Sequence, residues 1–166
     1  PGSETNAFDL RQAVNIPALP FLFVPDGEQL WLVNANRVWN LPMAGGASIT
    51  NEFSPELDLF PVALQRTANA LWIGCDLGLF RCDKRTRSVR RWNKADGLLL
   101  DEVRSLWVDG QRLWIGYEFH RQSDRRSVGG VSEMSLADAR IRSFIPSLSD
   151  SREPINEFDR LATEPD

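Results

Sequence analysis

Short runs of hydrophobic residues, separated by turn-forming residues, recur along the chain at a regular interval. Three runs have the same form: Leu30-Trp31-Leu32-Val33, Leu71-Trp72-Ile73-Gly74 and Leu113-Trp114-Ile115-Gly116. Their leading leucines stand at 30, 71 and 113, which is a spacing of 41 and then 42 residues. A period of about 40 to 45 residues with several short strands is typical of four-stranded β-propeller blades. The pattern therefore predicts an all-β chain of about three four-stranded antiparallel blades with partial flanking blades, an incomplete ring as a single chain.

The residues between these runs place four strands in each unit. In the middle unit we expect strands at 62–66, 71–75, 79–82 and 88–92, with a two-residue turn before Gly78. The third unit predicts strands at 103–108, 113–117, 131–134 and 140–144, and the first unit at 21–24, 30–34, 37–41 and 47–53. We expect Trp31, Trp72 and Trp114 to lie in the core between blades rather than to form an aromatic binding platform.

These strands divide the chain into consecutive units. Residues 1–3 have the form of a remnant of a cleaved expression tag. We expect 4–18 to hold the end of a preceding blade and a linker, because Phe8 precedes Asp26 by 18 residues and Trp92 precedes Asp109 by 17. The predicted units are blades at 19–53, 62–92 and 103–144, then a linker and the first strand of a further blade at 145–166.

The middle repeat also resembles a known family. From Leu71 to Asp83 it reads Leu-Trp-Ile-Gly-Cys-Asp-Leu-Gly-Leu-Phe-Arg-Cys-Asp, followed by Arg91-Trp92, Asp96-Gly97-Leu98 and Val103-Arg104-Ser105-Leu106. This succession resembles the two-component-regulator propeller repeat, strongly over 70–117 and more weakly over 20–53 and 130–166. Cys75 and Cys82 stand where that repeat usually has Thr and Tyr.

That family occurs in the periplasmic sensor regions of bacterial hybrid histidine kinases, typically as seven-bladed propellers. The resemblance therefore implies a propeller fold, a sensing or binding role and a periplasmic location, while the residues themselves leave a cytoplasmic location open. It implies no catalytic residue, because the repeated motif is structural.

Three blades are too few to close a ring, since propellers typically have about four to eight. An open stack leaves a hydrophobic blade face and unpaired strand edges at its ends, and both favour association. We therefore expect the ring to be completed by a homo-oligomer or by the remaining propeller blades of a longer protein. Under this hypothesis the chain is not a stable monomer.

Net charge and the length of the apolar runs limit the classes of partner that we expect. The net charge of −4 disfavours nucleic acid as a partner. No apolar run approaches the ~20 residues that cross a bilayer, so we expect no membrane insertion of this segment. The two cysteines, Cys75 and Cys82, are expected to be free and buried, because the predicted hairpin places them too far apart for a disulfide.

One unit departs from the repeat. Between Tyr117 and Gly130 the third unit carries an inserted hairpin loop, 118–129, where the middle unit has two residues. The insertion contains His120, the only histidine, and Arg121, Arg125 and Arg126. Loops on rigid scaffolds often carry function, and arginine forks recognise carboxylates and phosphates. We predict these four residues as a site for an acidic ligand or protein partner; the alternative is a solvated hairpin extension.

No pattern in the sequence indicates catalysis, a metal or a cofactor. His120 lacks the oriented partner and nucleophile that general-base chemistry requires. The chain has no cluster of metal-ligating residues and no glycine-rich phosphate loop. The sequence favours a non-enzymatic binding or sensing propeller segment for protein-protein or ligand recognition. The alternatives are a fragment of a propeller enzyme, such as a glycosidase or lyase with two converging carboxylates, and a purely structural propeller half.

Overall fold

The computed structural model of the chain describes residues 22–34, 37–43, 51–53, 60–121 and 127–145. Within them it forms three four-stranded sheets and one short 3-10 helix. The first sheet consists of β1 (Leu22–Asp26), β2 (Gln29–Val33), β3 (Val38–Pro42) and β4 (Asn51–Phe53). The second consists of β5 (Ala63–Arg66), β6 (Ala70–Cys75), β7 (Gly78–Asp83) and β8 (Val89–Trp92). The third consists of β9 (Val103–Asp109), β10 (Arg112–Arg121), β11 (Ser127–Ser135) and β12 (Ile141–Phe144).

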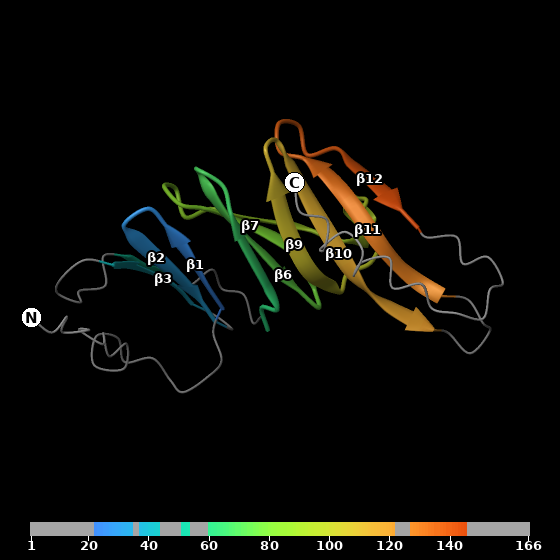
Figure 1. Cartoon of the computed structure of the whole chain (residues 1–166), viewed down its shortest axis with the longest axis horizontal. Coiled ribbons are helices and arrows are strands. Elements are labelled where there is room, and N and C mark those ends of the chain that lie inside the picture. Colours follow the sequence, from blue (N-terminus) through green and yellow to red (C-terminus); the bar gives the residue numbers. More distant parts are fainter. Residues whose placement is uncertain (1–21, 35–36, 44–50, 54–59, 122–126, 146–166) are drawn as a thin grey trace, which may run out of the picture.

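Each sheet is an antiparallel meander in which consecutive strands are neighbours. The sheets lie side by side in chain order (Figure 1), and the first strands of consecutive sheets, β1, β5 and β9, contact one another. Four-stranded meanders that stack in this way are propeller blades. The predicted fold class of all-β propeller blades is therefore confirmed, and we call the sheets the first, second and third blade.

The turn between the second and third strands explains a repeated glycine. β6 and β7 pair up to Cys75 and Gly78, which leaves the predicted two-residue turn between them. Gly78 has a φ of +127°, and a Cβ there would overlap the carbonyl oxygen of Trp92. Gly130 occupies the same position in the third blade, with a φ of +148° and the same conflict with the carbonyl oxygen of Phe144. Only glycine accommodates both the backbone angle and the close approach.

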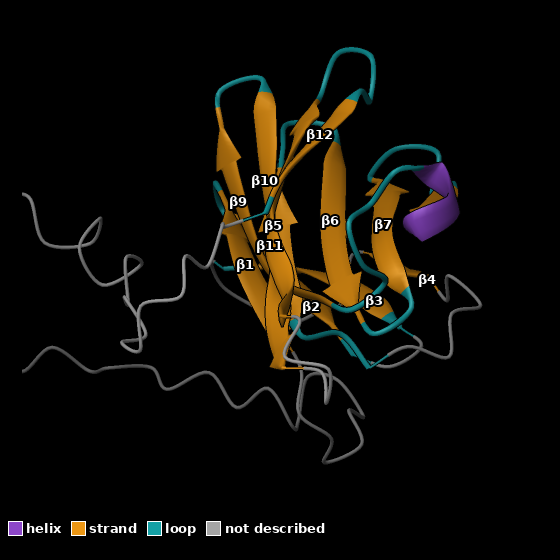
Figure 2. Cartoon of the chain, turned by 90° about the vertical axis from the view of Figure 1, so that its right-hand side faces the viewer, coloured by secondary structure: helices purple, strands orange, loops and turns teal. Residues whose placement is uncertain are grey.

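A capped helical turn, η1 (Lys94–Asp96), connects the second and third blades (Figure 2). The Asn93 side chain accepts a hydrogen bond from the backbone N–H of Ala95 at 2.8 Å. The Asp96 carboxylate accepts one from the backbone N–H of Asn93 at 3.0 Å, which completes a capping box. The helical turn ends at Gly97, and Leu98 after it is buried between the blades. The segment therefore both turns the chain and fills the core.

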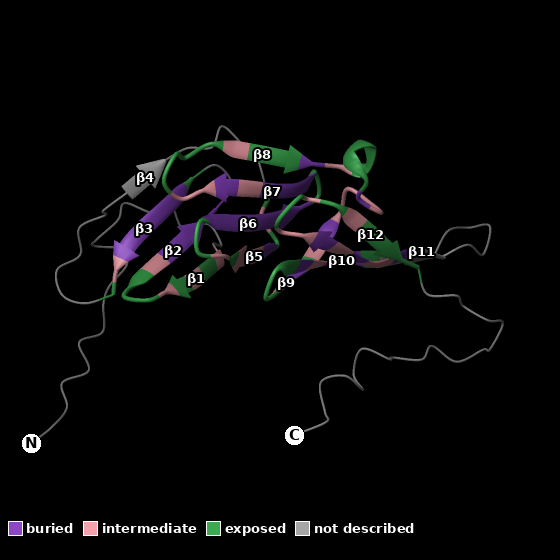
Figure 3. Cartoon of the chain, turned by 90° about the horizontal axis from the view of Figure 1, so that it is seen from above, coloured by how far each residue is buried: buried purple, intermediate pink, exposed green. Residues whose placement is uncertain are grey.

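Two hydrophobic cores lie at the junctions between blades. The core between the first and second blades includes Trp31, Val33, Val38, Leu71, Ile73, Cys75, Phe80 and Cys82. The core between the second and third blades includes Trp72, Leu79, Trp92, Leu98, Val103, Leu113, Ile115 and Met134. β6 contributes to both cores, because alternate residues of a strand point to opposite faces. All six of its residues are buried, whereas β12 is mostly exposed (Figure 3).

The hairpin of the third blade differs from its prediction. We expected a loop at 118–129, but β10 continues to Arg121 and β11 begins at Ser127. His120 pairs with Val128 and Arg121 with Ser127, after a register shift that follows Tyr117. Backbone N–H and C=O groups keep partners by pairing across such a bulge, so the arms of the insertion extend the sheet.

Parts of the predicted organisation fall outside the described residues. These are the partial unit at 4–18, the unit at 145–166 apart from its first residue, the tag remnant at 1–3 and the beginning of the strand predicted at 47–53. In the part of the chain that the structure describes, no helix combines the length and apolar character needed to cross a bilayer.

Candidate functional site

The tryptophan of the repeat occupies the same place in all three blades. Trp31, Trp72 and Trp114 stand on the second strands β2, β6 and β10, in matching register with their neighbours. Trp31 and Trp72 are buried at the two junctions, as predicted for core residues. Trp114 is only half-buried, because no described blade covers its side of the third blade, and its place between blades stays a prediction. It lies on the face of the third blade opposite to the core.

The junction of the first and second blades contains a charged cluster around its tryptophan. Nε1 of Trp31 donates a hydrogen bond to Oδ2 of Asp26 at 3.2 Å. Nζ of Lys84 lies 2.6 Å from the same oxygen, and a guanidinium nitrogen of Arg66 lies 2.9 Å from Oδ1. Because the lysine and arginine belong to the second blade, these bonds tie two blades together. We call Asp26, Trp31, Arg66 and Lys84 the junction cluster.

The cluster controls the ionisation of its aspartate. Burial of the Asp26 carboxyl acts to raise its pKa. The hydrogen bond from Lys84 and the positive charge of Lys84 both act to lower it. With the Trp31 N–H and the Arg66 guanidinium, they hold the pKa below its usual value of 3.8. The carboxylate is therefore ionised at neutral pH, matching the two cations around it.

The second junction has the same tryptophan but none of these charges. At the register position of the cluster's aspartate stands Thr67, and Val108 and Leu136 replace its arginine and lysine. Trp72 is only 4% exposed, and its Nε1 has no hydrogen-bond partner among the residues that the structure describes. A buried N–H without a partner is costly, because it has lost its bond to water.

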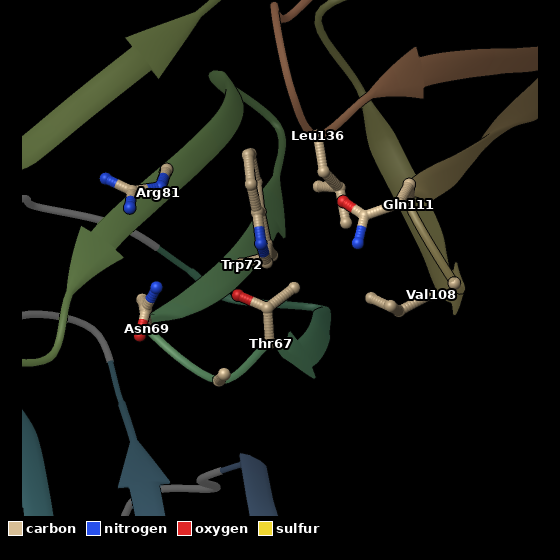
Figure 4. Close-up of a pocket in the computed structure, with 9 residues that line it drawn as sticks. Thr67, Asn69, Trp72, Arg81, Val108, Gln111 and Leu136 are labelled. Atoms are coloured by element: carbon tan, nitrogen blue, oxygen red, sulfur yellow. The ribbon is translucent and has the colours of Figure 1, made fainter.

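A groove of about 420 Å³ opens at this second junction, beside the turns that join first to second strands. Figure 4 shows the Trp72 indole standing between Arg81 on one side and Gln111 and Leu136 on the other. The nitrogen end of the ring is turned toward Thr67 and Asn69 (Figure 4). We call this the junction groove. It is lined by apolar carbon surface and by several hydrogen-bonding groups.

The third blade carries aromatic side chains on the face that turns away from the second blade. Trp107 pairs with Trp114 across β9 and β10, so the two share this face. Phe144 contacts Trp114, with ring centroids 6.1 Å apart and an interplanar angle of 36°. Trp107 is 65% exposed and Phe144 is 43% exposed. We call Trp107, Trp114, Glu133 and Phe144 the outward face.

Arginines surround the outward face. The guanidinium of Arg112 lies 5.9 Å from the ring centroid of Trp114, and that of Arg142 lies 5.8 Å from the ring centroid of Phe144. These distances are within the range of cation–π attraction. Glu133 on β11 is the register partner of Trp114 on β10 and of Arg142 on β12. The outward face is therefore aromatic at its centre and mainly basic around it.

The site predicted at the hairpin is described only in part. His120 and Arg121 lie near the end of β10, and Arg125 and Arg126 lie outside the described residues. The base of the hairpin is held by Glu118, whose carboxylate accepts from Nε of Arg104 at 2.8 Å. Arg104 also pairs with Asp76 in the turn of the second blade. Recognition of an acidic group by the four predicted residues stays a prediction.

The cysteines match their prediction. Cys75 and Cys82 are free and buried. Cys75 pairs with Gly78 beside the turn of the hairpin, whereas Cys82 pairs with Leu71 farther from the turn. Burial raises the pKa of both thiols, that of Cys82 to about 12. Neither has the exposed, low-pKa environment of a reactive thiol. Among the described residues, no group of three or more His, Cys, Asp or Glu is placed to hold a metal ion.

Sequence reasoning missed both the junction cluster and the junction groove. A signal was present, since aligning the three runs puts Asp26, Thr67 and Asp109 at one position. Its meaning depends on Lys84, which is 58 residues from Asp26 and belongs to another blade. Only the packing of blades brings these residues together.

Comparisons with known proteins add similarity of fold only. No family model matches the chain, and no curated protein matches its sequence. Among solved structures it is similar to the N-terminal domain of Nup159, with a TM-score of 0.45 and 18% identity over 76% of this chain and 31% of that chain. It is also similar to a chain in a complex of S. cerevisiae Dbp5 with Nup159, Gle1, IP6 and ADP, with a TM-score of 0.47 and 18% identity over 76% of this chain and 30% of that one. The chain thus spans less than a third of the length of these neighbours, and such similarity concerns fold, not function.

Proposed function

We propose that the chain is a non-enzymatic binding propeller segment whose outward face docks a further blade. The further blade comes from another propeller segment or, when the chain is alone, from a second copy. The observation that carries this proposal is the match between the outward face and a face already buried between blades. More specifically, we propose that this binding serves a sensing role, which the resemblance to two-component-regulator repeats implies.

The aromatic pair of the outward face, Trp114 and Phe144, has a close structural counterpart in the second blade. Trp72 and Trp92 of the second blade lie 5.7 Å apart at 34°, and Trp114 and Phe144 of the third lie 6.1 Å apart at 36°. The first pair is covered by the third blade and each ring is 4% exposed. The second pair occupies the same register positions on the next blade. It therefore has the geometry of a surface that receives a blade.

The partner's surface can be inferred from what covers the first pair. The third blade meets Trp72 and Trp92 with the side chains of Leu113, Ile115 and Met134, which are aliphatic and fully buried. A partner blade with a similar aliphatic face and acidic residues at its rim would complement the outward face and its arginines. Burial of one large apolar side chain contributes about 1.5 to 3 kcal/mol, so the exposed Trp107 alone is a substantial driving force.

The test is the solution mass of the chain at increasing concentration, measured by analytical ultracentrifugation. The unaltered chain should associate, and Trp107→Asp should weaken association at least about tenfold because it places a charge in the docked face. Leu77→Asp is the matched control: it introduces the same charge at an exposed residue in a turn of the second blade. A chain that stays monomeric throughout, or two variants that behave alike, would contradict the proposal.

A further inference from the structure

The junction groove has a filled counterpart in the same molecule. At the first junction, the indole N–H of Trp31 is bonded to the Asp26 carboxylate, and Lys84 and Arg66 neutralise that carboxylate. At the second junction, the same indole position, Trp72, borders a groove and has no acceptor among the described residues. The two sites share a backbone register, so the first shows which chemical group satisfies this kind of indole.

The groove combines hydrogen-bond donors with apolar surface, as a ligand site requires. Its donors are the buried N–H of Trp72 and the guanidinium of Arg81, which pairs with Trp72 across β6 and β7. Its apolar surface comes from the indole ring, Val108 and Leu136. A volume of about 420 Å³ is in the range of small-ligand sites.

Arg81 keeps donors available for a ligand. One of its guanidinium nitrogens lies 3.3 Å from Oδ2 of Asp83, which leaves its other N–H groups for further bonds. Asp83 is itself directed to its own turn, where Oδ1 accepts from the backbone N–H groups of Arg85 and Thr86 at 3.0 and 2.8 Å. The positive charge at the wall of the groove therefore favours an anionic acceptor over a neutral one.

We propose that the junction groove binds the acidic side chain of a peptide segment together with an adjoining apolar residue. The carboxylate takes the place that Asp26 holds in the junction cluster, accepting from Trp72 Nε1 and lying within reach of Arg81. The apolar residue packs on Val108 and Leu136, which replace the two cations of the cluster. The indole nitrogen is closed off by its neighbours, so the Thr67 side chain turns aside when the carboxylate enters.

The test is a titration of the ¹⁵N-labelled chain, observed through the indole N–H signal of Trp72. This signal is assigned as the one that disappears in Trp72→Phe. The probe is the peptide acetyl-Leu-Asp-Leu-amide, and the matched probes are the same peptide with Asn in place of Asp and acetate alone. The Asp peptide should shift the signal saturably, and the Asn peptide should bind at least about tenfold more weakly, since its amide carries no charge.

Two substitutions that add the same charge separate recognition from general effects. Thr67→Asp supplies an internal carboxylate at the position of Asp26, so it should weaken binding of the Asp peptide about tenfold or more. Leu77→Asp places the same charge at an exposed turn residue outside the junction groove, so it should leave binding of the Asp peptide unchanged. The inference is overturned if the Trp72 signal does not respond to the Asp peptide, or if Thr67→Asp binds it as tightly as the unaltered chain. If acetate binds as tightly as the Asp peptide, the groove recognises a carboxylate alone, and the proposal of a peptide ligand is wrong. None of these readings depends on association through the outward face.

Discussion

The junction cluster predicts a specific stability cost for Asp26→Asn. The asparagine keeps the size of the side chain and an oxygen that accepts from Trp31, so the substitution removes only the negative charge. Lys84 and Arg66 then lose their anionic partner, although Nζ of Lys84 retains the backbone carbonyl of Thr67 at 2.6 Å. The prediction is therefore a test of charge at this junction rather than of packing.

The magnitude follows from the exposure of the two ion pairs. The side chains of Lys84 and Asp26 are 11% and 24% exposed, and a hydrogen bond to a charged group at such a site contributes about 1.5 to 3 kcal/mol. Arg66 is 40% exposed, so solvent screening reduces its pair with Asp26 to less than about 1 kcal/mol. We expect Asp26→Asn to lower the free energy of unfolding by about 2 to 3 kcal/mol near pH 7.

The assay is urea unfolding followed by tryptophan fluorescence. Asp109→Asn is the matched control, because Asp109 occupies the same position in the third blade. Its pair with Arg112 is about half exposed on both sides, so this variant should cost less than about 0.5 kcal/mol. A cost for Asp26→Asn no larger than that of the control would refute the role assigned to the junction cluster.

The same comparison has a pH signature. Since the pKa of Asp26 is lower in the folded chain than its usual 3.8, the unfolded chain binds this proton first as the pH falls. The stabilisation is complete above the unfolded pKa and is lost as the pH falls through the folded one. The difference between the unaltered chain and Asp26→Asn should therefore be constant near neutral pH and shrink below about pH 4. A difference that is unchanged at lower pH would show that charge is not its cause.

Two further predictions concern the second blade. Gly78→Ala should lower the free energy of unfolding by at least about 2 kcal/mol, measured by the urea midpoint, because it meets both a φ of +127° and the Trp92 carbonyl; a neutral effect would contradict the turn geometry. Cys75 and Cys82 should not react with a thiol reagent such as DTNB in the folded chain and should both react in urea, because they are buried and burial raises their pKa; rapid labelling of the folded chain would contradict their place in the core.

Local pattern was sufficient to predict the blades. The Leu-Trp runs, the turn residues and glycines such as Gly78 act within one hairpin, where register follows from turn length. For the same reason, the separation of Cys75 from Cys82 could be derived from the sequence. The length of the third blade's hairpin could not be derived from the sequence. The pairing of β10 and β11 continues only because of a bulge after Tyr117, and no local signal marks that bulge.

The sites could not be predicted in the same way, because they belong to junctions between blades. The residues of the repeat determine by themselves that Trp31, Trp72 and Trp114 are equivalent in register. Tertiary structure decides that the first is bonded to a carboxylate, that the second borders a groove and that the third lies on an outward face. The deciding neighbours, Lys84 in one junction and Leu136 in the other, come from the following blade. Equivalent positions in a repeat thus acquire different chemistry, since burial and charge depend on what packs against each blade.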